Sequence, residues 1–518
     1  MGKEGKVWLV GAGPSDLGLL TLKGKAVLES AEVLVYDALV GAEILALAPP
    51  FAERINVGKR ASHHIRSQEE INQILLKKAK EGKRVVRLKG GDPFLFGRGG
   101  EELELLAANQ IPFEVVPGVT SAISVPAYNG IPVTHRNECS SVHIITGHKK
   151  KGEPLSLDFE ALVRLKGTLV FLMGVSALRE ICGGLLAAGM PGDTPAAILE
   201  KGTTSGQRRV VADLNSLPEE AGRASIGTPA IIVVGGVCRY SESFAWAEKR
   251  PLFGCRVIVT RPRECASELS RRLRDEGAEV LEIPAISTSP IAENPALDEA
   301  MEHLDEYTWL AFTSPAGVRI FFDRMRDKGQ DIRILAGKKL AAIGSGTARE
   351  CKARGLFPDL VPKVYDGAML GRLLAETCEE HAAILLPRAA KGSPEILEEL
   401  SKRPDLTVKD LPVYETHYEK PVILDIKEEL EKDPNTLVIF TSASTVRGFA
   451  AVASGVDFAG VQALCIGEKT RAQAEALGMK TATSEEASIE SLVELTRRVH
   501  RSRSAEMSEE NEESVSGR

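Results

Sequence analysis

Residues 85–102 read VVRLKGGDPFLFGRGGEE, and this stretch decides how the chain around it folds. It opens as a short apolar strand, turns at Gly90-Gly91-Asp92-Pro93, and passes a second glycine pair into an amphipathic run. Paired glycines after a strand let the backbone turn tightly and approach a ligand, because no Cβ stands in the way. Gly-Asp-Pro alone is common turn chemistry, but the full string is far more specific and predicts a ligand site where the strand ends.

The residues on either side alternate between strand and helix patterns. Apolar strands are expected at 7–10 and 33–36, and helices at 19–30 and 68–80. This rhythm predicts an α/β fold with a parallel sheet covered by helices on its faces. A charged, glycine-containing run at 149–153 precedes a second set of strands with more alternation, so we expect two lobes.

The composition is that of an ordinary globular protein with several domains. The 518 residues are 43% apolar and 26% charged, which is enough to bury ordinary cores. The net charge of −7 argues against general nucleic-acid binding. Eight scattered cysteines without metal-ligand spacing predict reduced thiols in a cytoplasmic protein and no metal site. Apolar runs fall far short of the ~20 residues of a membrane span, so we expect no membrane association.

The second half of the chain follows residues 241–253, a segment that loses periodicity and suits a linker. It contains a weak repeat, WLAFTSPAGVRIF at 309–321 and LVIFTSASTVRGF at 437–449, which predicts two similar α/β lobes. In each copy a strand delivers Thr-Ser to a helix N-terminus, where the hydroxyls either bind a carboxylate or only cap the helix. The polar residues 501–518 predict a disordered tail.

Two sets of motifs mark the two halves. The first set is GAGP at 11–14, VYD at 35–37, VGKR at 57–60, GGDPFLFGRGGEE at 90–102, PGVTSA at 117–122, GIPVTHR at 130–136, FLMG at 171–174 and GTPA at 227–230. The second is VTRP at 259–262, FTSPAGV at 312–318, LLPRA at 385–389, VYET at 413–416 and FTSAST at 440–445. Residues 1–240 therefore resemble the tetrapyrrole methylases, most of all the uroporphyrinogen-III C-methyltransferases, and residues 254–500 resemble the uroporphyrinogen-III synthases. The resemblance implies a two-lobed tetrapyrrole methylase fold followed by a two-lobed α/β synthase fold.

The methylase resemblance implies S-adenosyl-L-methionine as the methyl donor, S-adenosylhomocysteine as its product, and no metal. At the family's cofactor positions, small residues leave room for the donor, apolar side chains can line its site, and Asp92 can accept a hydrogen bond from it. Three residues depart from the family: Ser15 and Leu17 replace a usual glycine and proline, and Ala38 replaces an arginine that is one possible contact with the substrate. The residues at the family's cofactor positions are Pro14, Gly90, Gly91, Asp92, Leu95, Thr120, Ser121, Met173, Gly202, Thr228 and Ala230.

The resemblance also assigns proton transfer and substrate binding in the methylase half. Asp37 and Lys59 occupy the family's positions for proton acceptor and proton donor, although Asp37 can instead cap a helix and Lys59 can be an ordinary solvated lysine. Glu101, three residues after Arg98, is a rival base. Arg98 and Arg136 are expected to bind the substrate's carboxylates, since arginine forms bidentate pairs. For Arg136, a salt bridge between the lobes is the alternative.

In the synthase half, Tyr414 matches the family's candidate acid for the leaving hydroxyl; the alternative is a half-buried packing tyrosine. The expected substrate-binding hydroxyls in the cleft are Thr313, Ser314, Thr441 and Ser442.

Together these expectations describe a bifunctional enzyme of tetrapyrrole biosynthesis. One half closes hydroxymethylbilane to uroporphyrinogen III with inversion of ring D; the other adds two methyl groups to give precorrin-2, on the route to siroheme or cobalamin. The alternative is a methylase of another tetrapyrrole or of a diphthine-type substrate, fused to a non-catalytic two-lobed binding module. The family suggests a homodimer through the methylase domain, with tetrapyrroles as small-molecule partners.

Overall fold

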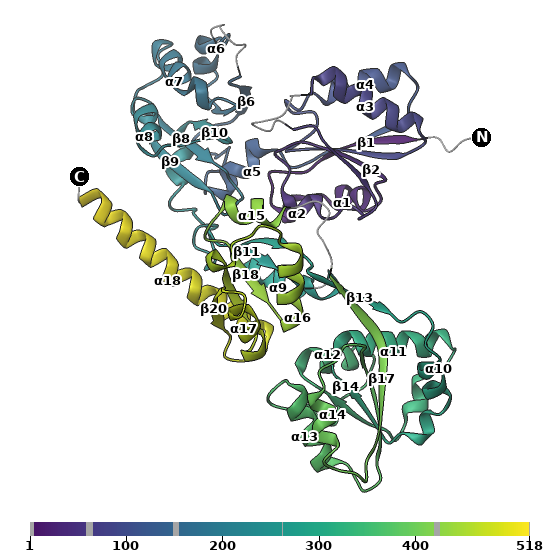
Figure 1. The fold of residues 1–518 in the computed structure, drawn as a ribbon. Coiled ribbons are helices and arrows are strands. Elements are labelled where there is room, and N and C mark those ends of the chain that lie inside the picture. The colour runs from purple at the N-terminus through teal and green to yellow at the C-terminus, as the bar shows by residue number, and fades with distance from the viewer. Residues whose placement is uncertain (1–4, 59–65, 149–154, 262, 419–424, 517–518) are drawn as a thin grey trace. The chain divides into compact units, whose positions relative to one another are not determined.

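The computed structural model describes residues 5–58, 66–148, 155–261, 263–418 and 425–516 (Figure 1). The chain forms two compact units, the first composed mainly of Met1–Val257 and Ser270–Glu282. The second is composed of Ile258–Leu269, Ile283–Pro421 and Asp425–Arg518.

The first sheet is parallel throughout, with the strand order β3-β2-β4-β1-β5. Its two faces each carry a buried apolar cluster, as expected for a parallel sheet covered by helices. One of these helices, α3, begins at a capping box formed by Ser67 and Glu70, and it buries Ile71, Leu75 and Leu76 along one face. The elements are β1 (Lys6–Gly11), α1 (Leu22–Leu28), β2 (Val33–Tyr36), α2 (Ala42–Leu45), β3 (Glu53–Asn56), α3 (Gln68–Lys80), β4 (Arg84–Lys89), α4 (Gly99–Ala108) and β5 (Phe113–Val116).

The second sheet is mixed, with the order β6-β7-β10-β8-β9 and only the β6–β7 pair parallel. Helix α5 joins the two sheets, since it follows β5 and packs Ala122 and Val125 into the core of the second sheet. The elements are α5 (Ser121–Tyr128), β6 (Val142–Thr146), α6 (Phe159–Arg164), β7 (Thr168–Leu172), α7 (Leu178–Ala187), β8 (Pro195–Glu200), β9 (Arg208–Asp213), α8 (Leu217–Arg223) and β10 (Ala230–Val234).

The non-periodic segment 241–253 packs against α5 and β9. The indole Nε1 of Trp246 donates to the carbonyl of Ala127 (2.9 Å), and the ring meets Tyr128 edge-on. Glu248 forms an ion pair with Arg209. These contacts explain how a stretch without strand or helix periodicity is held in place.

Two further sheets follow, with the orders β12-β11-β18-β19-β20 and β13-β17-β16-β14-β15. The repeat is visible as β14–α11–β15–α12 and β18–α16–β19–α17, and the first helix of each copy has a serine N-cap. The expected α/β fold with two lobes in each half is therefore confirmed. The elements are β11 (Arg256–Val259), α9 (Arg263–Asp275), β12 (Glu279–Glu282), β13 (Ile286–Pro290), α10 (Pro295–Glu302), β14 (Trp309–Phe312), α11 (Pro315–Asp327), β15 (Lys339–Ala342), α12 (Ser345–Lys352), α13 (Gly367–Thr377), β16 (Ala383–Ala389), α14 (Glu395–Leu400), β17 (Thr407–Tyr418), α15 (Ile426–Lys432), β18 (Leu437–Phe440), α16 (Ala443–Val452), β19 (Gln462–Cys465), α17 (Glu468–Glu475) and β20 (Lys480–Thr483).

The C-terminal segment differs from its expectation. Helix α18 (Ile489–Ser516) runs through most of residues 501–518, for which the sequence predicted a disordered tail. The segment is polar, but it contains no proline and no glycine before Gly517, so no residue in it breaks the helix begun by the apolar residues before it.

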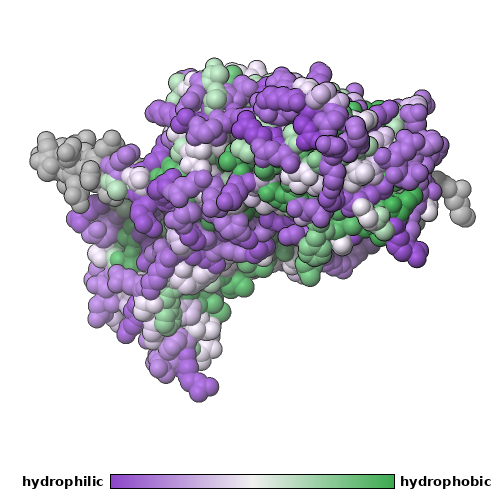
Figure 2. Space-filling model, turned by 90° about the horizontal axis from the view of Figure 1, so that it is seen from below, coloured by the Kyte–Doolittle hydropathy of each residue, from purple (hydrophilic) through white to green (hydrophobic). Residues whose placement is uncertain are grey.

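Hydrophilic residues cover most of the face shown in Figure 2, with apolar residues in separate patches. Over the described ranges, no helix is long and apolar enough to cross a membrane.

Candidate active sites

The glycines of the first sheet bring three loops into direct backbone contact. Built onto Gly118, a Cβ would lie 2.3 Å from the carbonyl oxygen of Gly91 and 2.6 Å from the Cα of Gly11. Gly91 also has a φ of +67°, which side chains rarely adopt. Gly13 and Gly91 exchange two backbone hydrogen bonds, of 3.1 and 2.8 Å. Only glycine fits these positions, and the ends of β1, β4 and β5 meet there.

Asp92 fastens two of these loops together. Its Oδ1 accepts from the backbone N–H groups of Phe94 (2.8 Å) and Leu95 (3.2 Å), and its Oδ2 accepts from that of Gly118 (3.1 Å). The expected role of Asp92 was to accept a hydrogen bond from the cofactor. The structure gives it three backbone donors, and so a structural role in shaping the site.

The remaining predicted cofactor residues of the first sheet lie beside this contact. A Cβ on Gly91 would come within 4.0 Å of Thr120 and Ser121 at the start of α5. The Thr120 hydroxyl caps that helix by accepting from the backbone of Ala122 (3.3 Å). Pro14, after β1, accepts through its carbonyl from the hydroxyl of Thr203 (2.8 Å), which lies in the loop between β8 and β9 of the second sheet.

The predicted cofactor residues of the second sheet lie at one end of its strands. Leu172 pairs with Ile231 and Glu200 with Ala230, so the end of β7, the end of β8 and the start of β10 coincide. The residues that follow or precede these ends are Met173, Gly202, Thr228 and Ala230.

Two contacts join this end of the second sheet to the first sheet. Gly202 lies so close to Val125 of α5 that an added Cβ would meet its Cγ1 at 2.4 Å. Leu95 packs against the core of the second sheet. Met173 is half exposed, with a left-handed φ of +57°. Pro14, Leu95 and Gly202 thus lie where the two sheets meet, and Met173, Thr228 and Ala230 lie at the corresponding end of the second sheet. Backbone-lined loops and an exposed methionine are residues that fit an adenosyl sulfonium compound.

Asp37 lies directly after β2 and belongs to a chain of charges. Its Oδ1 accepts from Arg87 Nη2 (2.7 Å), while its side chain remains 29% exposed. Arg87 in turn donates from Nε to Glu102 (3.1 Å), and Lys89 donates to the same carboxylate (2.8 Å). Burial lowers the pKa of Lys89. The neighbouring charge of Arg87 lowers it further, and Glu102 acts in the opposite direction.

Arg87, Lys89 and Glu102 are not among the site residues predicted from the sequence. A signal was present in the strand RVVRLK, since Arg87 and Lys89, two residues apart, must share one face with the apolar Val85. Such a pair is buried only when an anion faces it.

Arg98 and Glu101 pair with each other. Arg98 donates from Nε and Nη2 to the two carboxylate oxygens of Glu101 (2.8 and 2.6 Å), and both side chains are exposed. The hydrogen bonds from Arg98 hold the pKa of Glu101 below its usual value. Arg136 is exposed and has no ion-pair partner among the residues the structure describes, so the bridging salt bridge is not seen. Lys59 lies outside the described residues.

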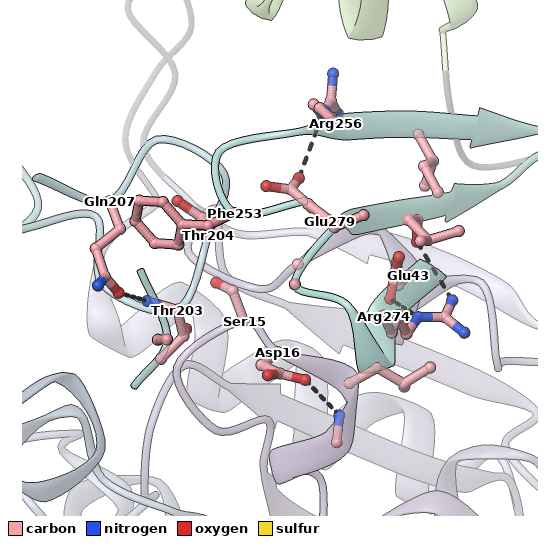
Figure 3. Close-up of a pocket in the computed structure, with 18 of the residues that line it drawn as sticks. Ser15, Asp16, Glu43, Thr203, Thr204, Gln207, Phe253, Arg256, Arg274 and Glu279 are labelled. Atoms are coloured by element: carbon pink, nitrogen blue, oxygen red, sulfur yellow. Dashed lines mark hydrogen bonds and ion pairs between the residues drawn. The ribbon is translucent and has the colours of Figure 1, made fainter. Parts of the chain in front are cut away.

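A separate cavity of about 480 Å³ lies within the first unit (Figure 3). Its wall includes Ser15, Asp16 and Thr203, which are neighbours of Pro14 and Gly202, but none of the predicted cofactor residues. In this wall Arg274 donates to Glu43 (3.3 Å), yet burial outweighs that contact and raises the pKa of Glu43 to about 7. Across the described ranges, no group of three His, Cys, Asp or Glu side chains could hold a metal.

In the synthase half, the structure brings Tyr414 and Ser314 together. The buried Tyr414 hydroxyl donates to Ser314 Oγ (2.9 Å), and burial raises its pKa, so the phenol stays protonated. Ser314 caps α11 by accepting from Gly317 N (3.0 Å), and Thr313 precedes it. In the other repeat Ser442, preceded by Thr441, caps α16 and shares a hydrogen bond with Ser444. Both serines therefore cap their helices, whatever else they bind.

Known proteins resemble both halves of the chain. A model of the family "Uroporphyrinogen-III synthase HemD" matches residues 267–494, and one of the "Tetrapyrrole (Corrin/Porphyrin) Methylases" matches residues 6–218. The "Porphyrin biosynthesis protein HemD" of Ruminiclostridium josui is 46% identical over 95% of this chain and 97% of its own length. The S-adenosyl-L-methionine-dependent uroporphyrinogen III methyltransferase of Methanosarcina barkeri is 54% identical over 46% of this chain and 93% of its own length.

Among solved structures, the uroporphyrin-III C-methyl transferase of Thermus thermophilus complexed with S-adenyl homocysteine is 42% identical. The match covers 45% of this chain and 99% of that one, with a TM-score of 0.40.

Proposed function

Because this chain belongs to the porphyrin biosynthesis HemD family, in which a tetrapyrrole methylase is joined to a uroporphyrinogen-III synthase, we propose that it catalyses two consecutive reactions. The synthase half closes hydroxymethylbilane to uroporphyrinogen III with inversion of ring D. The methylase half then transfers two methyl groups from S-adenosyl-L-methionine to uroporphyrinogen III, giving precorrin-2. The observation that carries the proposal is the glycine contact at Gly11, Gly91 and Gly118, where β1, β4 and β5 end, with the Asp37 carboxylate directly after the neighbouring strand β2.

The methylase residues divide the work between alignment and proton transfer. When bound, S-adenosyl-L-methionine supplies a methyl group on an already activated sulfonium. The glycine-lined loops, with Met173 and Leu95, hold the donor and the pyrrole carbon in line, which is where most of the rate enhancement of such a displacement arises. Asp37 accepts the proton released as the ring rearranges. It is a better candidate than Glu101, because Arg98 occupies both carboxylate oxygens of Glu101, whereas Arg87 contacts Oδ1 alone of Asp37.

Substrate recognition in this half falls to arginines. Uroporphyrinogen III carries eight carboxylates, which suit the bidentate geometry of guanidinium groups. Arg136 is exposed and free to bind one of them, whereas Arg98 must exchange its contact with Glu101 for one with the substrate. Lys59 keeps its proposed role as proton donor.

In the synthase half, Tyr414 is the proposed acid for the departing hydroxyl. Its raised pKa keeps the proton on the oxygen at neutral pH, and Ser314 orients that oxygen. Thr313, Thr441 and Ser442 are proposed to bind the folded linear substrate.

The proposed domain division is a methylase at 1–240, a linker at 241–253 and a synthase at 254–500. A cytoplasmic homodimer formed through the methylase domain completes the proposal.

The test is incubation of the whole chain with hydroxymethylbilane and S-adenosyl-L-methionine, with the products separated by isomer and mass. The expected product is a dimethylated type III tetrapyrrole. Without the donor, the same protein should release unmethylated uroporphyrinogen III. Formation of the type I isomer alone would remove the synthase function, and an unmethylated type III product in the presence of the donor would remove the methylase function.

A further inference from the structure

The charges behind Asp37 form one continuous chain inside the first lobe. Arg87 and Lys89 project from the same face of β4, and Glu102 meets them from the first turns of α4. Glu102 is fully buried, as are almost all of the Arg87 and Lys89 side chains. Asp37, at the other end of the chain, is the only member with substantial exposure.

Glu102 is bound unevenly. Its Oε1 accepts three hydrogen bonds, from Arg87 Nε (3.1 Å), Lys89 Nζ (2.8 Å) and Gln68 Nε2 (3.3 Å). Its Oε2 is inaccessible to solvent and has no partner within the described part of the chain. Here all of its donors meet one oxygen, and this fixes where the guanidinium of Arg87 lies.

We infer that Glu102 is a positioning residue for methyl transfer, which holds the Arg87 guanidinium so that its Nη2 fixes the Asp37 carboxylate toward the substrate. The inference rests on the proposed methylase function. Arg87 spans the two anions with separate nitrogens, Nε to Glu102 and Nη2 to Asp37, while Nη1 is held by the carbonyl of Leu88 (3.2 Å). Because the guanidinium is a rigid plane, fixing one edge fixes the other.

Removing the charge of Glu102 changes both geometry and electrostatics. The charged groups around it are Arg87 and Lys89 from β4, Glu101 from α4, and Asp37 after β2; α3 contributes the uncharged Gln68 and Asn72. In Glu102→Gln, Arg87 has Asp37 as its one carboxylate partner and is drawn toward it. The carboxylate of Asp37 is then stabilised more strongly, which makes it a poorer proton acceptor.

The experiment compares Glu102→Gln with Glu104→Gln in the full-length protein. Glu104 is an exposed carboxylate on the same helix, so it matches the charge change without touching the cluster. For Glu102→Gln we expect kcat for methyl transfer to fall about 10- to 100-fold, with the dissociation constant of S-adenosylhomocysteine within about twofold of the parent's. The acidic limb of its pH–kcat profile should move about half a unit to one unit toward lower pH. Glu102→Asp, which keeps the charge, should recover part of the rate, and Glu104→Gln should match the parent throughout.

A second variant distinguishes loss of positioning from loss of activity through unfolding. Glu102→Gln combined with Lys89→Met removes one charge of each sign and leaves the Arg87–Asp37 pair neutral. It should fold like the parent, as judged by thermal unfolding, and still show the lowered kcat. Crystal structures of both variants should show the Arg87 guanidinium and the Asp37 carboxylate shifted together from their parental places, a readout that does not depend on activity.

Three outcomes would overturn the inference: an unchanged kcat and pH profile in Glu102→Gln, a double variant restored to the parental rate, or Arg87 and Asp37 side chains that keep their parental places in both variants. A parent protein that binds S-adenosylhomocysteine but methylates no tetrapyrrole would instead refute the proposed function, and the crystallographic readout would still decide the positioning role.

Discussion

The close approach of the glycine loops gives a sharp prediction for Gly118→Ala. The new Cβ would sit 2.3 Å from the Gly91 carbonyl oxygen and 2.6 Å from the Gly11 Cα, and both are backbone atoms that no side-chain rotation can move. Ordinary contacts begin near ~3.5 Å, so the Gly91 loop must retreat by about 1 Å. Overpacking of this kind costs about 1–3 kcal/mol. At about 2–4 °C per kcal/mol, the melting temperature of the first unit should fall by about 2–12 °C.

The same displacement should weaken binding of the donor. If the loop must return to its parental place to accept a ligand, the strain appears as a loss of affinity of about 10- to 100-fold. The assay is calorimetric titration of the full chain with S-adenosylhomocysteine, alongside scanning calorimetry with and without it.

Gly100→Ala is the matched control for this prediction. An added Cβ there meets nothing within 4 Å, and Gly100 lies in α4, so alanine should leave affinity unchanged and raise stability by about 0.5–1 kcal/mol. Parental affinity and melting temperature in Gly118→Ala would refute the claim that close backbone contact shapes this site.

Three more substitutions probe other parts of the chain. Asp37→Asn should lower kcat for methyl transfer about 100-fold or more, while calorimetry shows S-adenosylhomocysteine bound as in the parent; a parental rate would assign proton acceptance elsewhere. Tyr414→Phe removes the hydroxyl that contacts Ser314 and should slow ring closure at least about tenfold, as measured by conversion of hydroxymethylbilane. Glu43 holds its proton to about pH 7 when folded, against 4.5 as its ordinary value, so the parent should lose stability as pH rises from 4.5 to 7. Glu43→Gln should abolish up to about 3 kcal/mol of that loss, as measured by urea unfolding at pH 5 and 8, and identical pH dependence in both proteins would contradict the assignment.

The sequence was most informative where backbone geometry alone decides the structure. The glycines at 91 and 118 could be recognised because a positive φ at one and a close backbone approach at the other exclude other residues, and strand-end placement followed from the alternating pattern. The serine caps of α11 and α16 were foreseeable for the same reason, since a cap depends on residues three positions away.

Charged pairs that need a partner could be recognised in the sequence, as at Arg87 and Lys89, but which distant side chain or amide would meet them could not. The amides that bind Asp92 include Gly118, 26 residues away, and Glu102 meets Arg87 and Lys89 only because α4 packs beside β4. The ion pair between Arg98 and Glu101 could have been predicted, because residues three apart on a helix are neighbours. The sequence-based prediction instead gave Arg98 to substrate binding and Glu101 to proton transfer. The polarity of residues 501–518 predicted disorder, but the segment contains no helix-breaking residue before Gly517, and α18 runs to Ser516.

The Asp92 carboxylate has a consequence for selectivity. Asp92 holds its own loop against Gly118 before any ligand binds, so the proposed donor site is preorganised. Backbone atoms cannot move aside for a larger ligand by changing rotamer, as side chains can. The site should therefore select nucleoside analogues by shape. It should tolerate changes where the ligand faces solvent and reject even one added methyl group on the side that faces the glycines.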